Sequence, residues 1–360
     1  MDQKLLNKIL KRKEEGTLRS LSSFDGMIDF FSNDYLGLAK IETSGVYAHG
    51  STGSRLISGT SKTAMNAEKE LAKFFNSESA LLFNSGYDSN LGFFSAVPQR
   101  GDTIIYDELI HASVRDGIRL SFAHHFSFLH NDIEDLEKKI NSAKGTVYVA
   151  IESLYSMDGD LSPLRKIQQI CAKKNAYLII DEAHSSGVLG ENGKGFVNAL
   201  GLESKVFARL ITFGKAYGSH GAVILGSKDL TEFLTNFARS FIYTTALPDA
   251  TVARNNTIVR TEDLNDRRLK LQNNLTYFRS NFLHPGLISE TNSPIQILQI
   301  GSIEETSVLA KKIQDRGMAV KAIFSPTISK GKERIRLCFH SFNTKNEIDV
   351  LIKVLSEAEK

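Results

Sequence analysis

One lysine in this chain stands where an amine nucleophile could work. Lys215 lies in TFGKAYGSHG (residues 212–221), between one apolar run at 208–211 and another at 222–225. A lysine stem drawn between two apolar strands loses solvation, which lowers the pKa of the ammonium and makes the neutral amine available. The segment equally fits a tight turn with an incidental lysine. A second chemically suited residue elsewhere in the chain would favour a reactive lysine over an incidental one.

The segment LIIDEAH offers such a partner. Asp181 ends its apolar run, and a buried carboxylate has to be paired. It is either the N-cap of the following segment or the partner of a ring nitrogen in a heterocyclic cofactor. His184 completes a DxxH spacing, but no HxxxH or CxxC accompanies it, so cofactor contact is favoured over a metal site.

A third segment suits an anion. Ser85, Gly86 and Tyr87 follow an apolar run and open a helical pattern, and the free N–H groups of a helix N-terminus bind anions. An ordinary strand-to-helix turn explains the same residues. The chain has no GxGxxG or GxxxxGK[ST], and the GK at 214–215 is followed by alanine, which disfavours a nucleotide P-loop.

A histidine and two arginines complete the candidates. His111 follows IIYDELI and is either a structural histidine or an imidazole that stacks on a flat cofactor ring. Arg334 and Arg336 alternate in ERIRLCF and so share one strand face, where arginine forks bind carboxylates. A solvated edge strand accounts for at least one of them equally well.

The elements that must position these side chains alternate regularly. Strand-like runs separated by helix-length segments predict an α/β fold with helices on both faces of a mostly parallel sheet. The last two runs are only six residues apart, too few for a helical crossover, so this pair is predicted to be antiparallel. The seven predicted strands are ALLFNSG, DTIIYDE, HHFSFLHN, TVYVAIES, AYLIIDEAH, ARLITFG and GAVILGS.

Strand ends give the strongest argument for a single site. In sheets of this kind ligands bind outside the carboxyl ends of the strands. The candidates at or just after strand ends are Ser85, Gly86, His111, Ser156, Asp181, His184 and Lys215.

The pattern also predicts three regions. Residues 1–35 form an N-terminal helix and arm, 36–250 the large domain, and 251–360 a smaller α/β domain that opens with a long helix over 254–282. Leu5, Leu6, Ile9 and Leu10 share one face of the first helix, which needs the rest of the chain or a second subunit to pack on.

Composition excludes several functions. The chain has 360 residues and a net charge of +3, without a basic run interleaved with aromatics, so a nucleic-acid partner is disfavoured. Its two cysteines lie far apart, which favours a reduced, cytoplasmic setting. No secretory signal and no apolar run long enough to cross a bilayer is present, so no membrane partner is expected.

Taken together, the motifs resemble a known family over nearly the whole chain. The segments NDYLGL, HASVRDGIRL, SLYSMDGDLSPL, IDEAHSSGVLG, TFGKAYGSHGA, IYTTALP and RIRL resemble the α-oxoamine synthases. These are fold-type I enzymes that use pyridoxal 5′-phosphate (PLP) to condense an amino acid with an acyl thioester and release CO2. SPIQILQI and AIFSPTISKGKERIRL are most similar to the branch that uses L-alanine and a pimeloyl thioester, on CoA or an acyl-carrier protein. Phe324 stands where that branch usually has an arginine.

The resemblance implies a role for each matched residue. Lys215 would carry the cofactor and act as base at Cα, Asp181 would pair with the pyridine nitrogen, and His111 would stack on the ring. His184 and Ser156 would lie near the phenolic oxygen. The implied phosphate group of residues is Ser85, Gly86, Tyr87 and Thr212, with Thr244 or Thr245 from the other subunit of a homodimer that shares its active sites. The implied substrate residues are Asn33 and Arg336 at the amino-acid carboxylate and Arg19 near the acyl chain.

Several alternatives stay open. Within the family, glycine with acetyl-CoA and serine with a long acyl chain are possible substrate pairs. Outside it, a DxxH metal-dependent hydrolase would need tightly bound metal. A non-enzymatic protein of the same fold would bind PLP without releasing thiol.

Overall fold

The computed structural model describes residues 2–42, 44–290 and 292–357, and these residues form two compact units. The large unit comprises Asn33–Ser156 and Asp160–Leu269. The small unit comprises Met1–Ser32, Met157–Gly159 and Lys270–Lys360.

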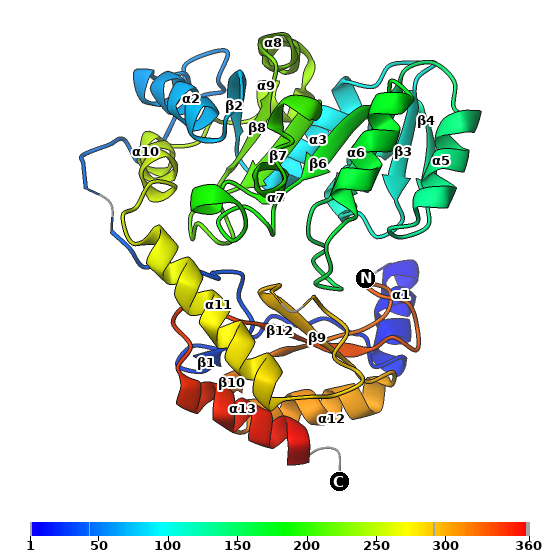
Figure 1. Ribbon diagram of the computed structural model, residues 1–360, viewed down its shortest axis with the longest axis vertical. Helices are drawn as coiled ribbons and strands as arrows, with labels where there is room; N and C mark the ends of the chain where they lie inside the picture. The colour runs from blue at the N-terminus through cyan, green and yellow to red at the C-terminus, as the bar shows by residue number, and fades with distance from the viewer. Residues whose placement is uncertain (1, 43, 291, 358–360) are drawn as a thin grey trace. The chain divides into compact units, whose positions relative to one another are not determined.

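The large unit contains the alternating strands and helices (Figure 1). Its strands are β2 (Ser79–Phe83), β3 (Thr103–Asp107), β4 (His124–Phe128), β5 (Val147–Glu152), β6 (Tyr177–Asp181), β7 (Ala208–Thr212) and β8 (Ala222–Gly226). Its helices are α2 (Lys62–Phe74), α3 (Gly86–Ala96), α4 (Ala112–Leu120), α5 (Ile133–Ser142), α6 (Leu164–Lys173), α7 (Phe196–Ala199), α8 (Lys228–Phe237), α9 (Arg239–Ile242) and α10 (Asp249–Ile258), with short 3-10 turns η1 (Glu191–Gly193) and η2 (Glu203–Lys205).

Within the described residues of this unit, seven strands form one sheet in the order β2-β8-β7-β6-β5-β3-β4. The pairs from β7 through β4 are parallel, whereas β8 is antiparallel to both β2 and β7. This confirms the predicted α/β fold with a seven-stranded, mostly parallel sheet and one reversed strand.

Apolar residues cover both faces of the central part of the sheet because the inner strands are largely apolar, whereas the edge strand β4 is mostly exposed. On one face, Ile104 and Ala150 pack with Phe93 of α3 and with residues of α4, α8 and α9. On the other, Ile105 and Val149 pack with residues of α5, α6 and α7. Figure 1 shows α5 and α6 in front of the sheet and α3 behind it.

The turn between β7 and β8 carries Lys215. The N–H of Phe213 bonds to the carbonyl of Gly221 (2.9 Å), and the N–H of Gly218 bonds to the carbonyl of Lys215 (2.8 Å). Gly218 has φ +56°, and a Cβ there would lie 2.2 Å from the backbone nitrogen of Ala39. Only glycine fits this position, because both the backbone conformation and the space exclude a side chain.

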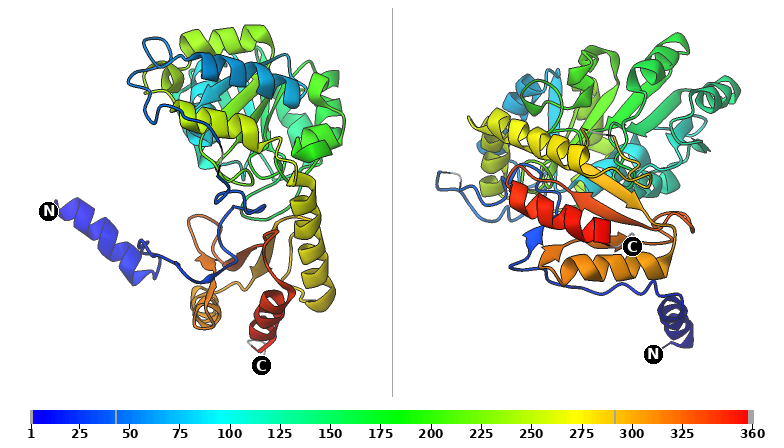
Figure 2. Two further views of the ribbon diagram at one scale, coloured as in Figure 1. Left: turned by 90° about the vertical axis from the view of Figure 1, so that its left-hand side faces the viewer. Right: turned by 60° about the horizontal axis from the view of Figure 1, so that its bottom comes forward.

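The small unit is built on a three-stranded antiparallel sheet with β12 in the middle. Helix α12 packs against this sheet and against α13 (Figure 2). The elements are α1 (Gln3–Glu14), β1 (Ile28–Asp29), β9 (Ile295–Gln299), α12 (Ile303–Gln314), β10 (Met318–Ala319), β11 (Lys321–Ile323), β12 (Arg334–Cys338) and α13 (Lys345–Glu357), with β1 parallel to β10.

The first helix is mostly exposed in the described structure. Helix α1 buries none of its side chains, and Leu5, Ile9 and Leu10 are exposed. Both views of Figure 2 show α1 standing apart from the small sheet. The predicted apolar face is therefore present, but a single chain leaves it uncovered.

Two expectations differ from the structure. The long helix over 254–282 is two helices, α10 and α11 (Leu264–Asn281), because the β-branched Val259 and Thr261 disfavour helix and the hydroxyl of Thr261 contacts Asp263 (3.4 Å). The predicted regions 1–35, 36–250 and 251–360 differ from the compact units, which divide inside α11 and join residues 1–32 to the small unit. Helix α10 remains with the large unit because it packs on α2.

No helix within the described ranges is both long enough and apolar enough to cross a membrane.

Candidate active site

A cavity of about 200 Å³ opens at the carboxyl ends of β5, β6 and β7, beside the N-terminus of α3. Six of the residues singled out in the sequence line it: Gly86, Tyr87, His111, Asp181, Thr212 and Lys215. Seven further residues complete the lining: Ser89, Asn90, Ser113, Glu152, Ala183, Leu210 and Ile211.

Lys215 is half-buried and begins a chain of hydrogen-bonded side chains. Its Nζ lies 2.7 Å from Nε2 of His184, and Nδ1 of His184 lies 2.8 Å from the hydroxyl of Tyr35. That hydroxyl also donates to Oδ1 of Asn33 (3.0 Å). An ammonium can only donate, so a charged Lys215 requires the lone pair on Nε2 of His184 and its proton on Nδ1. The predicted Lys215, His184 and Asn33 are thus connected through the buried Tyr35.

Asp181 is a buried carboxylate with a donor on each oxygen. The side-chain amide of Asn90 donates to Oδ2 (2.8 Å), and the backbone N–H of Ala183 donates to Oδ1 (2.9 Å). Asp181 is 8% exposed, through the cavity that it lines. A carboxylate with a donor on each oxygen is held in one orientation, in which it can face a positive group of a ligand.

His111 caps helix α4 and presents its ring to the cavity. Desolvation lowers the pKa of His111; Lys215 lowers it further, while the carboxylates of Asp181 and Asp116 act in the opposite direction. The ring is therefore neutral around pH 7.

The N-terminus of α3 faces the cavity with the predicted anion-binding residues. Ser85 caps the helix by accepting the N–H of Asp88 (3.0 Å), while Gly86 lies against Thr212, whose Oγ1 would be 3.6 Å from a Cβ at Gly86. The first-turn N–H groups of Gly86 and Tyr87 have no acceptor within the helix. The Tyr87 hydroxyl bonds to Asp116, which raises the pKa of Tyr87. This end of the cavity can bind an anion.

Glu152 adds a second carboxyl group that the sequence reasoning missed. It ends β5 in register with Asp181 at the end of β6, and it is 3% exposed. Burial raises the pKa of Glu152 well above its usual range, and the nearby Asp181 raises it further. Its Oε1 has no hydrogen-bond partner within the part of the chain that the structure describes. Glu152 is therefore held as a neutral acid in the wall of the cavity.

Tyr35, Asn90 and Ser113 were missed as well. A signal was available only for Glu152, which follows the apolar run VYVAI just as Asp181 follows LII. Tyr35 and Ser113 lie inside the motifs NDYLGL and HASVRDGIRL, but no role was assigned to them there, and Asn90 is placed by a partner 91 residues away in the sequence.

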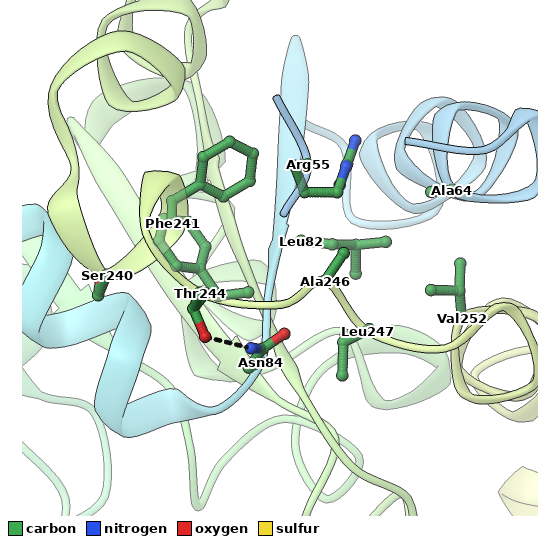
Figure 3. Close-up of a pocket in the computed structure, with 11 residues that line it drawn as sticks. Arg55, Ala64, Leu82, Asn84, Ser240, Phe241, Thr244, Ala246, Leu247 and Val252 are labelled. Carbon is green, nitrogen blue, oxygen red and sulfur yellow. Dashed lines mark hydrogen bonds between the residues drawn. The ribbon is translucent and has the colours of Figure 1, made fainter. Parts of the chain in front are cut away.

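Thr244 and Thr245 lie at a different place in the large unit. The side-chain amide of Asn84 donates to Oγ1 of Thr244 (3.1 Å) and to the carbonyl of Thr245 (2.6 Å). Figure 3 shows Asn84 and Thr244 beside a second small cavity of about 10 Å³, which has room for about one water molecule. Thr244 is half-buried and Thr245 is exposed, and neither lines the cavity that contains Lys215.

Ser156 lies in a loop that is joined to the end of β3 by hydrogen bonds of His130. His130 places Nδ1 2.9 Å from Asp107 and Nε2 2.8 Å from Asp160. Burial alone lowers the pKa of His130, but the bonds to Asp107 and Asp160 outweigh it and raise the pKa to about 10. The bridge between Leu154 and Leu161 closes the same loop. His130 is thus a cation at neutral pH that holds the loop to the end of β3.

We expect this imidazolium to stabilise the fold in a pH-dependent way. The pKa of His130 is raised on folding, so its contribution is complete below about pH 6.5, declines as the pH rises and is lost above about pH 10. His130→Gln should lower the free energy of unfolding by about 3 kcal/mol at pH 6. Urea unfolding of both proteins from pH 6 to pH 10 measures the difference. A difference that stays constant over this range would contradict the assignment.

Arg19 and Arg336 belong to the small unit. Arg19 is exposed and donates to Oγ1 of Thr327 (3.1 Å). Arg336 is 8% exposed, and its Nη1 lies 2.8 Å from Sγ of Cys338. Neither arginine of β12 is on a solvated edge strand, because β12 is central and Arg334 is engaged by Asp158 (2.7 Å). No group of three or more His, Cys, Asp or Glu side chains is arranged to hold a metal ion in the described ranges.

Comparisons with known proteins agree along the whole chain. The family model "Aminotransferase class I and II" matches residues 25–355. An 8-amino-7-oxononanoate synthase from Emericella nidulans is 38% identical over 394 residues, covering 98% of this chain and 94% of the relative.

Solved structures are similar to the chain over most of its length as well. A serine palmitoyltransferase from S. paucimobilis with PLP and myriocin bound has a TM-score of 0.87 and 26% identity, covering 99% of this chain and 96% of that one. An 8-amino-7-oxononanoate synthase from Francisella tularensis has a TM-score of 0.76 and 31% identity, covering 92% and 98%.

Proposed function

The chain belongs to the aminotransferase class I and II family, and on that premise we propose that it is a PLP-dependent 8-amino-7-oxononanoate synthase. It condenses L-alanine with a pimeloyl thioester to 8-amino-7-oxononanoate, CO2 and free thiol, a step of biotin biosynthesis. The observation that carries the proposal is one cavity that combines Lys215, Asp181, His111 and the N-terminus of α3.

The residues of the cavity fit PLP. A buried carboxylate, an imidazole, an amine and a helix N-terminus are the groups needed for a ring nitrogen, a ring face, an aldehyde and a phosphate. When bound, PLP supplies an electron sink that stabilises negative charge on the amino-acid Cα.

We assign the roles of the protein groups as follows. Nζ of Lys215 binds the cofactor and removes the proton from Cα of alanine, and Asp181 keeps the ring nitrogen protonated. His111 stacks on the face of the ring, and His184 and Ser156 lie near its phenolic oxygen. The phosphate is held by Ser85, Gly86, Tyr87 and Thr212.

The remaining assignments concern the substrates and a partner subunit. Asn33 and Arg336 bind the carboxylate of alanine, for which the arginine fork supplies two donors. Arg19 lies near the acyl chain. We propose a homodimer in which Thr244 or Thr245 of one subunit reaches the phosphate in the other.

Thiol release measured with each amino acid tests this function. We expect L-alanine with pimeloyl-CoA to release thiol and to give a product of the mass of 8-amino-7-oxononanoate, at a rate at least about tenfold above glycine or L-serine. The discrimination rests on the size of one side chain, which is worth about 10–200-fold. Activity only with glycine and acetyl-CoA, or only with serine and palmitoyl-CoA, would keep the PLP chemistry and overturn the substrate assignment.

A chain-length series tests the acyl half. Phe324 stands where the related branch usually has an arginine, so the free carboxylate of the pimeloyl group needs another partner. We include heptanoyl-CoA, which has the same chain length as pimeloyl-CoA but no terminal carboxylate. A preference for heptanoyl-CoA would contradict pimeloyl as the natural acyl group.

A further inference from the structure

We propose that a buried hydrogen-bonded chain, Asp181–Asn90–Ser113–His111, fixes His111 as a neutral imidazole with its proton on Nε2. Asn90 and Ser113 are then positioning residues of the cofactor site, a role that was not assigned to them from the sequence. The role toward PLP rests on the proposed function, whereas the protonation state of His111 is a property of the protein alone.

In the hydrogen-bonded chain, the orientation of the Asn90 side-chain amide is determined by Asp181. Nδ2 of Asn90 lies 2.8 Å from Oδ2 of Asp181 and 3.0 Å from Oγ of Ser113. A carboxylate only accepts hydrogen bonds, so the group that faces Asp181 has to be the NH2 and not the carbonyl of Asn90. Both amide hydrogens are then used, one by Asp181 and one by Ser113. Asn90 is 2% exposed and Ser113 0%, so water does not compete for these bonds.

The direction of the next bond follows from the first. Oγ of Ser113 accepts from Asn90, which leaves its single hydrogen to donate to Nδ1 of His111 at 2.7 Å. The backbone N–H of Ser113 also points to Nδ1, at 3.2 Å. Nδ1 therefore faces two donors and has to offer a lone pair. A neutral ring with its proton on Nε2 satisfies every bond. An imidazolium would also carry a proton on Nδ1, which would point at the hydroxyl and the backbone N–H of Ser113.

The surrounding charges are consistent with a neutral ring. Desolvation lowers the pKa of His111, and the nearby Lys215 lowers it further. Asp181 and Asp116 act in the opposite direction without reversing the shift. Asp181 also accepts hydrogen bonds from Asn90 (2.8 Å) and from the backbone N–H of Ala183 (2.9 Å), so the hydrogen-bonded chain joins it to His111 as well.

Asp181 and His111 would contact two different parts of PLP, the ring nitrogen and the ring face. Asp181 faces the cavity with a carboxyl group that suits a protonated ring nitrogen, while His111 stays neutral, which avoids placing a cation on the face of that positive ring. Because one chain of bonds joins both residues, the loss of Ser113 should release His111 to take up a second proton in mildly acidic solution.

The first test is nitrogen NMR of the full chain labelled on its histidines, with and without PLP, with the His111 signals assigned by their loss in His111→Gln. We expect Nδ1 unprotonated and Nε2 protonated from pH 8 down to pH 6. Protonation of Nδ1 in the wild-type protein at pH 7 would overturn the proposal. This measurement needs no folded Ser113 variant.

The second test is PLP binding by Ser113→Ala, followed by titration of the apoprotein with PLP at pH 6 and pH 8. We expect the Kd to rise at least about tenfold more at pH 6 than at pH 8, because only the acidic sample charges His111. Ser113→Thr should restore the wild-type behaviour because it keeps the hydroxyl. Ser95→Ala is the matched control, since Ser95 lies on α3, does not line the cavity and donates to the carbonyls of Leu91 (2.6 Å) and Gly92 (3.4 Å) of its own helix.

The outcomes separate the two proposals. An equal change of Kd at both pH values in Ser113→Ala would overturn the role of Ser113. If the wild-type protein bound no PLP at either pH, the proposed function would fail, and the NMR result would still decide the state of His111.

Discussion

Turnover of L-alanine and pimeloyl-CoA falls by at least about 1000-fold when Lys215 is replaced by alanine. Lys215 is the one lysine among the described residues that line the cavity, and its Nζ is 2.7 Å from a histidine that can accept its proton. The variant loses both the covalent attachment of the cofactor and the base at Cα, so no other group in the cavity can replace it. Thiol release and the visible absorption of bound PLP measure the two losses.

Lys215→Arg is the matched control for this variant. Arginine keeps the positive charge beside His184 but does not deprotonate in proteins, so it can neither attach the cofactor nor act as base. We expect it to be as inactive as Lys215→Ala, which would show that the loss arises from the amine and not from the charge. Turnover within tenfold of wild type in either variant would refute the role of Lys215.

Asp181→Asn should bind PLP more weakly and lose about 100-fold to 1000-fold in kcat. The substitution keeps the size of the side chain but removes the negative charge that holds a proton on the ring nitrogen of the cofactor. It also disturbs the hydrogen bond that Nδ2 of Asn90 donates to Oδ2 of Asp181 (2.8 Å). One oxygen of the carboxylate becomes an NH2 group in the variant, and an NH2 group facing Asn90 would set two donors against each other. Stoichiometry of bound PLP and kcat, measured on the same sample, separate binding from chemistry.

Asp132→Asn is the control for this experiment. Asp132 caps α5 through the N–H of Asp135 (2.9 Å) and does not line the cavity. It should cost about 1 kcal/mol of stability at most and leave kcat unchanged. If Asp181→Asn retained full kcat with PLP bound, Asp181 would have no role in maintaining the charge of the ring.

The amino-acid sequence by itself determined the strands, their order along the chain and the position of the chemistry. The inner strands are short apolar runs, for which a sheet buried on both faces is the expected place, whereas the edge strand β4 (HHFSF) is mostly exposed. The six residues between the predicted runs ARLITFG and GAVILGS were enough to predict that the last strand is reversed, since no crossover helix fits there. Polar residues at strand ends then indicated Asp181, His111 and Lys215 together.

Tertiary structure decided which residues surround them. Asn90 meets Asp181 across 91 residues of sequence, and Tyr35 meets His184 across 149. Such pairs depend on the order of the strands in space, in which β8 lies between β2 and β7, and no local pattern records that order. The division of the chain inside α11 has a related reason, because it depends on packing against distant elements, which helical periodicity alone does not indicate. The break between α10 and α11 has a local cause, the β-branched Val259 and Thr261, which the prediction of one long helix overlooked.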